Sequence, residues 1–195
     1  ARDYDLTVEQ QQWHWRGLNL RGEVLQLDNL PLLDLPLENA SLALQAYALL
    51  DLPWQPERLA AALAATRVVG RLDRRVLSWQ GKTLTLLLDV GHNPHAAEYL
   101  AQQFAARPLR GKRLAVFGLL ADKDLLGVLQ ALRSEIADWA VVDLPTARSR
   151  PATELKAALQ TLGAQVESYP DVAAALQAQC AQATAEDEIL LFGSF

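Results

Sequence analysis

Residues 83–95 read TLTLLLDVGHNPH, an apolar run that ends in a cluster of polar side chains. The apolar part predicts a buried strand, and Pro94 suits the first position of a helix, where its missing N–H costs nothing. Open α/β sheets bind ligands where a strand ends and a helix begins. Asp89 can accept hydrogen bonds from a pair of hydroxyls, while His92 and Asn93 can donate to an anion beside the N–H groups that open the helix. We therefore expect a strand–turn–helix unit with a binding site at its turn.

Downstream of residue 70, strand patterns alternate with helical patterns. The expected elements are a hairpin over 76–88 that turns at Gln80-Gly81, helices over 94–106, 123–134, 153–162 and 171–183, and strands over 113–118, 139–143 and 188–193. Such alternation implies parallel pairing and right-handed crossovers. This region is predicted to be a Rossmann-like α/β domain with a mostly parallel sheet. Its strand ends should bring together residues 89–95, 118–124, 143–150 and 193–195.

The first part of the chain has a different pattern. Residues 13–27 alternate around two glycines and predict a hairpin, and helical patterns follow over 40–50 and from Pro56 to Leu63. We place the domain boundary between Val69 and Gly70, so that residues 1–69 and 70–195 form separate regions.

Composition limits the class of protein. The chain has 195 residues, of which 51% are hydrophobic and 21% charged, as in a soluble globular protein. A net charge of −5 argues against nucleic-acid binding, and no apolar run approaches the length of a membrane span. The single cysteine, Cys180, excludes an internal disulfide and fits a reducing cytoplasm. Because the chain contains no methionine and opens at Ala1, we expect it to be an internal fragment of a longer protein.

Several motifs occur together in an order that resembles one family. The stretch Asp89–His95 resembles the Asp-Gly/Ala-Ala-His-Asn-Pro motif of folylpolyglutamate synthases and bacterial dihydrofolate synthases, in the Mur ligase superfamily. The other motifs that resemble this family are Pro-Leu-Glu-Asn-Ala-Ser at 36–41, Val-Gly-Arg-Leu at 69–72, Phe-Gly-Leu-Leu-Ala-Asp-Lys-Asp at 117–124 and Leu-Phe-Gly-Ser-Phe at 191–195. Val69 replaces the proline of the family's linker. The resemblance covers roughly residues 30–195 and is closest to the bifunctional bacterial type.

The resemblance implies an ATP-dependent amide ligase. Such an enzyme phosphorylates a pterin-linked carboxylate to an acyl phosphate, which the amine of L-glutamate then attacks; dihydropteroate and folate are the acceptors. Residues 1–69 would be the tail of a central ATPase domain, and residues 70–195 the C-terminal domain. The phosphate loop and the Mg²⁺ ligands would lie upstream, because Gly81-Lys82-Thr83 lacks the glycine spacing of a phosphate loop. The fragment alone should therefore not turn over ATP.

The resemblance also implies roles for individual residues. Asn39 would contact the adenine side of ATP, Arg71 its phosphates and Asp89 its ribose hydroxyls. His92 is the candidate catalytic residue, near the phosphates or the glutamate. Lys123 and Ser194 are the candidates for binding glutamate or the acyl-phosphate region. No residue of this chain is expected to bind a metal ion.

Each residue also has a simpler interpretation. Asn39 is equally suited to cap a helix that begins at Ala40. Arg71 alone would more often be a solvated linker charge, and residues 122–124 a solvated helix start. Arg148 and Arg150 would bind an anion at the sheet edge or belong to an exposed loop.

Two other functions compete with the folate-type ligase. One is a peptidoglycan-precursor Mur ligase, and the other is an α/β binding domain without chemistry of its own. In the favoured interpretation the protein is a cytoplasmic monomer that binds neither nucleic acid nor membrane.

Overall fold

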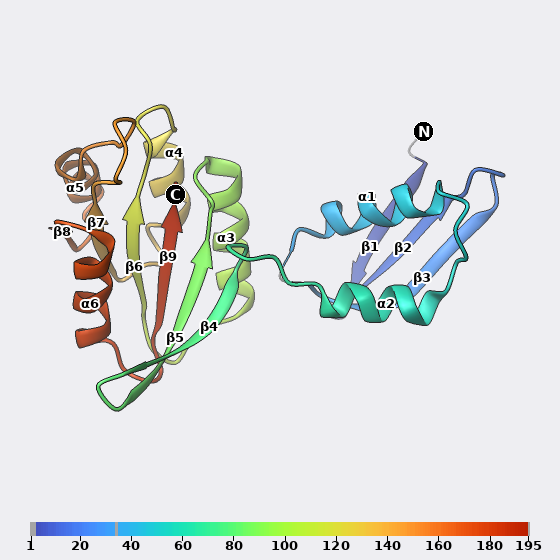
Figure 1. Cartoon of the computed structure of the whole chain (residues 1–195), viewed down its shortest axis with the longest axis horizontal. Helices are drawn as coiled ribbons and strands as arrows, with labels where there is room; N and C mark the ends of the chain where they lie inside the picture. Colours follow the sequence, from blue (N-terminus) through green and yellow to red (C-terminus); the bar gives the residue numbers. More distant parts are fainter. Residues whose placement is uncertain (1–2, 34, 195) are drawn as a thin grey trace. The chain divides into compact units, whose positions relative to one another are not determined.

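The computed structural model describes residues 3–33 and 35–194, which form two compact units. The first unit runs to Val68 and the second begins at Val69. Each unit has a hydrophobic core of its own: one buried cluster lies within the first unit, and two lie within the second. The units are described separately below (Figure 1).

The first unit is a three-stranded antiparallel sheet with two helices. Its strands are β1 (Tyr4–Glu9), β2 (Gln12–Leu18) and β3 (Val24–Pro31), in that spatial order, and its helices are α1 (Leu37–Ala48) and α2 (Pro56–Ala65). Along β2, Trp13 and Trp15 are fully buried, whereas Arg16 on the other face is exposed. The predicted hairpin over 13–27 forms as β2 and β3. Strand β1 was not predicted, although Tyr4, Leu6 and Val8 alternate with polar residues along it.

Helix α1 begins earlier than the sequence predicts. Pro36, in an extended conformation, stands at the N-cap position without a side-chain hydrogen bond, and the helix starts at Leu37. Asn39 therefore lies inside the first turn, exposed, with its backbone N–H bonded to the carbonyl of Pro36 at 3.0 Å. The interpretation of Asn39 as a helix cap is wrong, because the proline at position 36 sets the start of the helix three residues before it.

The second unit contains a six-stranded sheet in the order β4-β5-β9-β6-β7-β8. Strand β4 (Asp73–Trp79) is antiparallel to β5 (Lys82–Asp89), and the remaining pairs are parallel. The other strands are β6 (Arg113–Gly118), β7 (Asp138–Val142), β8 (Val166–Tyr169) and β9 (Glu188–Gly193). The Rossmann-like α/β fold with a mostly parallel sheet is confirmed. The hairpin turns at Gln80-Gly81 as predicted, with φ of 45° and 80°, the conformation that two-residue hairpin loops favour.

Helices cover both faces of this sheet (Figure 1). Helices α3 (Pro94–Ala106), α4 (Leu125–Leu132) and α5 (Ala152–Thr161) share one core cluster, and α6 (Val172–Gln182) packs in the other. The chain steps outward from β5 to β8 along one face and returns through α6 on the opposite face, as right-handed crossovers require. The return places β9 between β5 and β6. The carboxyl ends of these three strands therefore meet at one edge.

One sequence-based boundary in this unit needs correction, and one strand was missed. Helix α4 begins at Leu125 and not at Lys123, because the carboxylate of Asp124 caps it by accepting from the N–H of Gly127 at 3.0 Å. Strand β8 was not predicted, since it has only four residues and two of them, Glu167 and Ser168, are exposed and polar. Such a short edge strand carries little hydrophobic periodicity.

Candidate functional site

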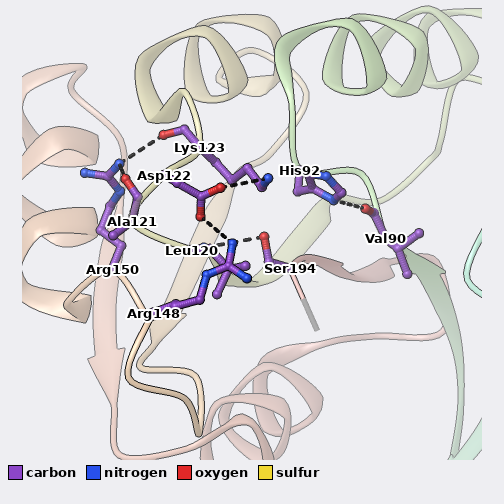
Figure 2. A network of polar contacts seen from close by, with 9 residues as sticks. All are labelled: Val90, His92, Leu120, Ala121, Asp122, Lys123, Arg148, Arg150 and Ser194. Atoms are coloured by element: carbon purple, nitrogen blue, oxygen red, sulfur yellow. Dashed lines mark hydrogen bonds and ion pairs between the residues drawn. The ribbon is translucent and has the colours of Figure 1, made fainter.

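The candidate site lies at the carboxyl edge of β5, β9 and β6. Asp89 is in register with Phe192 and Gly118 with Gly193, so the loops that follow these strands start side by side. The predicted clustering of the strand ends is confirmed by two contacts: Ser194 Oγ accepts from Leu120 N–H at 3.4 Å, and Arg148 donates to Asp122 at 3.1 Å (Figure 2). Phe195, the last residue of the predicted cluster, lies outside the described residues.

Asp89 is buried, with 6% of its surface exposed, and its carboxylate binds backbone N–H groups. Oδ1 accepts from Gly91 at 2.7 Å and Oδ2 accepts from Leu72 at 2.8 Å. Burial raises the pKa of Asp89 above its ordinary value of 3.8, while these two hydrogen bonds and the charge of Arg71 act in the opposite direction. Each carboxylate oxygen has further lone-pair capacity, so the group can still accept from ligand hydroxyls.

The turn after β5 positions His92. Asn93 caps α3 by accepting from Ala96 N–H at 2.9 Å, and Pro94 takes the first helical position, as predicted. His92 Nδ1 lies 2.9 Å from the carbonyl oxygen of Val90. Because a carbonyl only accepts, this contact assigns the proton to Nδ1 and leaves a lone pair on Nε2 of the neutral ring. His92 therefore presents a nitrogen that can accept a proton.

Lys123 belongs to the neighbouring loop after β6. Its Nζ lies 3.0 Å from Asp122 Oδ2, and in Figure 2 its side chain extends toward His92. The helices that follow these two loops pack closely, since a Cβ placed on Gly127 of α4 would lie 2.5 Å from Pro94 Cγ of α3. The hydrogen bond from Lys123, followed by that from Arg148, lowers the pKa of Asp122. Lys123 and Arg148 both pair with the carboxylate of Asp122, so these three side chains together carry a net positive charge.

The two arginines of the loop after β7, Arg148 and Arg150, differ in exposure and in the groups they bind. The side chain of Arg148 is 66% exposed and pairs with Asp122. The side chain of Arg150 is only 15% exposed; it donates to the carbonyls of Ala121 at 2.6 Å and Lys123 at 3.0 Å and to Glu154 at 2.8 Å. The expectation of an exposed loop is wrong for Arg150, because its guanidinium holds the loop that carries Lys123.

Ser194 lies at the end of β9, with 5% of its surface exposed. Gly193 precedes it with φ of 125°, and a Cβ there would overlap the carbonyl oxygen of Gly118. Ser194 N–H donates to the same carbonyl at 3.0 Å. The glycine thus allows β9 to approach β6 closely and brings the Ser194 hydroxyl beneath the loop of Leu120.

The other predicted site residues precede the cluster in the chain. Arg71 is exposed and lies just before β4, between two residues that bond to the end of β5. Asn39 is an exposed residue of α1 in the first unit. Among residues 3–33 and 35–194, no group of three or more His, Cys, Asp or Glu side chains is placed to hold a metal ion. In the same described part of the chain, no helix has the length and apolar character needed to cross a membrane.

The sequence alone did not predict that Asp122 and Arg150 help to hold the loops of the site. Each has, besides a partner nearby in the sequence, one more than twenty positions away in the chain, Arg148 and Ala121 respectively. The only signal available was the spacing of charged residues within each loop, which does not indicate what those charges contact.

Comparison with known proteins agrees with this geometry. The family described as Mur ligase, glutamate ligase domain, matches residues 70–195. Dihydrofolate synthase/folylpolyglutamate synthase of Haemophilus influenzae is 34% identical, over 100% of this chain and 47% of that protein. Escherichia coli FolC in complex with DHPP and ADP superposes with a TM-score of 0.80 and 35% identity, over 98% of this chain and 43% of that one.

A second solved structure extends the comparison. It is a bifunctional folylpolyglutamate synthase/dihydrofolate synthase with Mn, AMPPNP and L-glutamate bound, and it matches with a TM-score of 0.77 and 34% identity, over 98% of this chain and 43% of that one. The chain spans about half the length of the relatives it matches. The α/β fold, the order of its motifs and the match over residues 70–195 lead to one conclusion: the chain belongs to the Mur ligase family and carries its glutamate ligase domain.

Proposed function

We propose that this chain is the C-terminal portion of an ATP-dependent ligase that adds L-glutamate to dihydropteroate and to folates. The observation that carries the proposal is the convergence of His92, Lys123 and Ser194 at the carboxyl edge of β5, β6 and β9. Residues 70–195 would be the glutamate-ligase domain, and residues 1–69 the last part of the central ATP-binding domain. Relatives bound to ADP, DHPP and L-glutamate support the choice of substrates.

Three residues are proposed to bind the nucleotide. The exposed guanidinium of Arg71 supplies a fixed fork of donors that matches phosphate oxygens. The remaining lone pairs of Asp89 would accept from the ribose hydroxyls, and Asn39 would contact the adenine side. The described residues offer no cluster of metal ligands, so we assign no step of the reaction to a metal ion held by this chain.

The residues of the cluster are proposed to handle the amino acid. The ammonium of Lys123 would pair with a carboxylate of glutamate, and the hydroxyl of Ser194 would hydrogen-bond to the same substrate region. In the first step a substrate carboxylate oxygen bonds to the γ-phosphorus of ATP and ADP departs. In the second step the glutamate amine bonds to the acyl carbon and phosphate departs. Nε2 of His92 is free to receive the proton that the amine loses.

The test is an assay of the longer protein that contains this chain. We expect phosphate release from ATP that requires both dihydropteroate and L-glutamate, and His92→Ala should lower kcat about 100-fold or more, as loss of a general base does. His95→Ala, at an exposed position in the first turn of α3, is the matched control and should keep near-normal activity. Release with a muramyl substrate and not with dihydropteroate would overturn the folate assignment.

Residues 1–195 alone serve as a second control. The chain contains no phosphate loop, so we expect it to release no phosphate above background. A monomeric, cytoplasmic enzyme is part of the same proposal, and light scattering on the longer protein tests its oligomeric state.

A further inference from the structure

The chain enters the second unit through a short segment, residues 70–72, that is bonded to the end of β5. Val90 N–H donates to the carbonyl of Gly70 at 2.8 Å, and Leu72 N–H donates to Asp89 Oδ2 at 2.8 Å. The side chain of Leu72 is buried in the core beneath α3, with 7% of its surface exposed. Residues on both sides of Arg71 are therefore fixed to the carboxyl edge of the sheet.

This segment has a backbone conformation that tertiary contacts must hold. Gly70 and Leu72 have φ of 71° and 43°, in the left-handed region, which is uncommon for leucine. A Cβ on Gly70 would lie 3.0 Å from Val90 Cγ1. Burial of the Leu72 side chain, the bond from Val90 to Gly70 and the bond from Leu72 to Asp89 hold this conformation together, and Asp89 supplies the only charged acceptor among these contacts.

The two residues just before this segment are much more exposed to solvent. Val68 and Val69 are 45% and 78% exposed, whereas Leu72 is buried. The contacts that anchor the connection therefore begin at Gly70, and Arg71 belongs to the second unit.

We infer that Asp89 is a positioning residue for Arg71: by holding Leu72 N–H, its carboxylate fixes the backbone that carries the Arg71 guanidinium at the nucleotide side of the sheet edge. The inference rests on the proposed function in one respect, namely that Arg71 contacts the phosphates of ATP. Asp89 would then have two roles: a direct contact with the ribose, and an effect on the nucleotide through Arg71.

Limited trypsin digestion of the 195-residue chain tests the backbone part of the inference. In the wild type, trypsin should cut after the exposed Arg67 and spare the bond between Arg71 and Leu72. Asp89→Asn keeps the shape of the side chain but offers only one acceptor oxygen to two backbone N–H groups. It should speed the cut after Arg71 about tenfold or more, the factor that corresponds to losing one charge-assisted hydrogen bond.

Internal and matched controls separate local release from unfolding. Arg74 and Arg75 lie in β4, paired with β5, and must remain protected in Asp89→Asn. Asp143→Asn removes another carboxylate that accepts from a backbone N–H, that of Ala152 at 2.8 Å, and should leave the cut after Arg71 unchanged. An unchanged rate in Asp89→Asn, or equal acceleration after Arg74 and Arg75, overturns the inference. Gly70→Ala, which disturbs the same segment without touching Asp89, should also expose Arg71.

A double-mutant cycle in the longer protein tests the effect on catalysis. If Asp89 acts in part through Arg71, then Asp89→Asn should lower kcat/KM for ATP by a clearly smaller factor in the Arg71→Ala background than in the wild type, and the remaining factor measures the direct ribose contact. Fully multiplicative losses would show that Asp89 contacts the nucleotide independently, and would overturn the positioning role. The digestion requires no turnover, so its result can be interpreted even if the proposed function is wrong.

Discussion

Asp89, Asp143 and Asp187 each direct a carboxylate at backbone N–H groups from another segment. Their partners are Leu72, Ala152 and Lys112, at 2.8, 2.8 and 2.6 Å. Hydrogen bonds to an ionised acceptor are roughly twice as strong as neutral ones. These three carboxylates therefore fix one segment of the chain to another.

Asp187 illustrates how such an anchor responds to pH. Burial opposes its ionisation, but hydrogen bonds from Lys112 and Thr184 outweigh burial and lower its pKa below the ordinary value of 3.8. A lowered pKa stabilises the fold above the unfolded-state value, and this stabilisation is lost as the pH falls through the folded-state value. Asp187→Asn should lower the free energy of unfolding at pH 7 by about 1–3 kcal/mol, and by less near pH 3.

Urea unfolding at the two pH values measures this difference. Glu186→Gln, at the exposed neighbouring position, is the control and should change stability little. A loss for Asp187→Asn that is the same at both pH values would contradict the assignment.

The two arginines of the loop after β7 give a second contrast between neighbouring residues. Arg150→Lys loses the planar guanidinium that donates through Nη2 to two carbonyls and through Nη1 to Glu154, and should cost about 1.5–3 kcal/mol of unfolding free energy. Arg148→Ala removes an exposed ion pair with Asp122 and should cost less than about 1 kcal/mol. Chemical denaturation of both variants tests the order; equal losses would mean that Arg150 does not hold the loop.

At the scale of elements, the sequence predicted those strands and helices whose ends carry strong local signals. Asn93-Pro94 marked the start of α3, and Gln80-Gly81 marked the turn between β4 and β5. Strand β8 was not predicted, because a strand at the edge of a sheet needs no hydrophobic alternation. The hydrogen bonds of Asp89 and Arg150 also escaped, since they join segments whose proximity only the folded sheet creates.

The end of β9 provides a test at this scale. Gly193→Ala introduces a Cβ that overlaps the carbonyl of Gly118, at a φ of 125° that other residues rarely adopt. We expect a loss of about 2–4 kcal/mol in unfolding free energy, within the range for strained backbone and overpacking. Gly163→Ala is the matched control: its φ is 75° but the space around it is open, so the loss should be about 1–2 kcal/mol. Similar melting temperatures for the two variants would contradict the argument from close approach.

At the scale of the whole molecule, the core clusters follow the division into units. Every buried residue of the two clusters around the six-stranded sheet lies between Leu72 and Phe192. The sequence placed the boundary between Val69 and Gly70, one residue from the division between Val68 and Val69. That boundary was placed where the second helical pattern ends and alternating strands and helices begin.

Residues 69–195 should consequently fold when produced alone. We expect them to keep the near-ultraviolet circular dichroism of Trp79 and Trp139 and to unfold cooperatively on heating. A shorter piece, residues 81–195, lacks β4 and Leu72 and should unfold at a lower temperature. Loss of the near-ultraviolet signal in residues 69–195 would show that the unit depends on the rest of the chain.

The order of the strands also bears on synthesis. Strand β9 is made last among these elements but lies between β5 and β6, both of which pair with it. Until Gly193 has left the ribosomal exit tunnel, β5 and β6 have no shared partner, and the centre of the sheet is open. The apolar strands of the nascent chain therefore stay exposed until β9 can pair with them. The closing of the sheet depends on contacts between segments distant in sequence, and such contacts form slowly. Chaperone binding to the growing chain should accordingly persist until β9 has emerged.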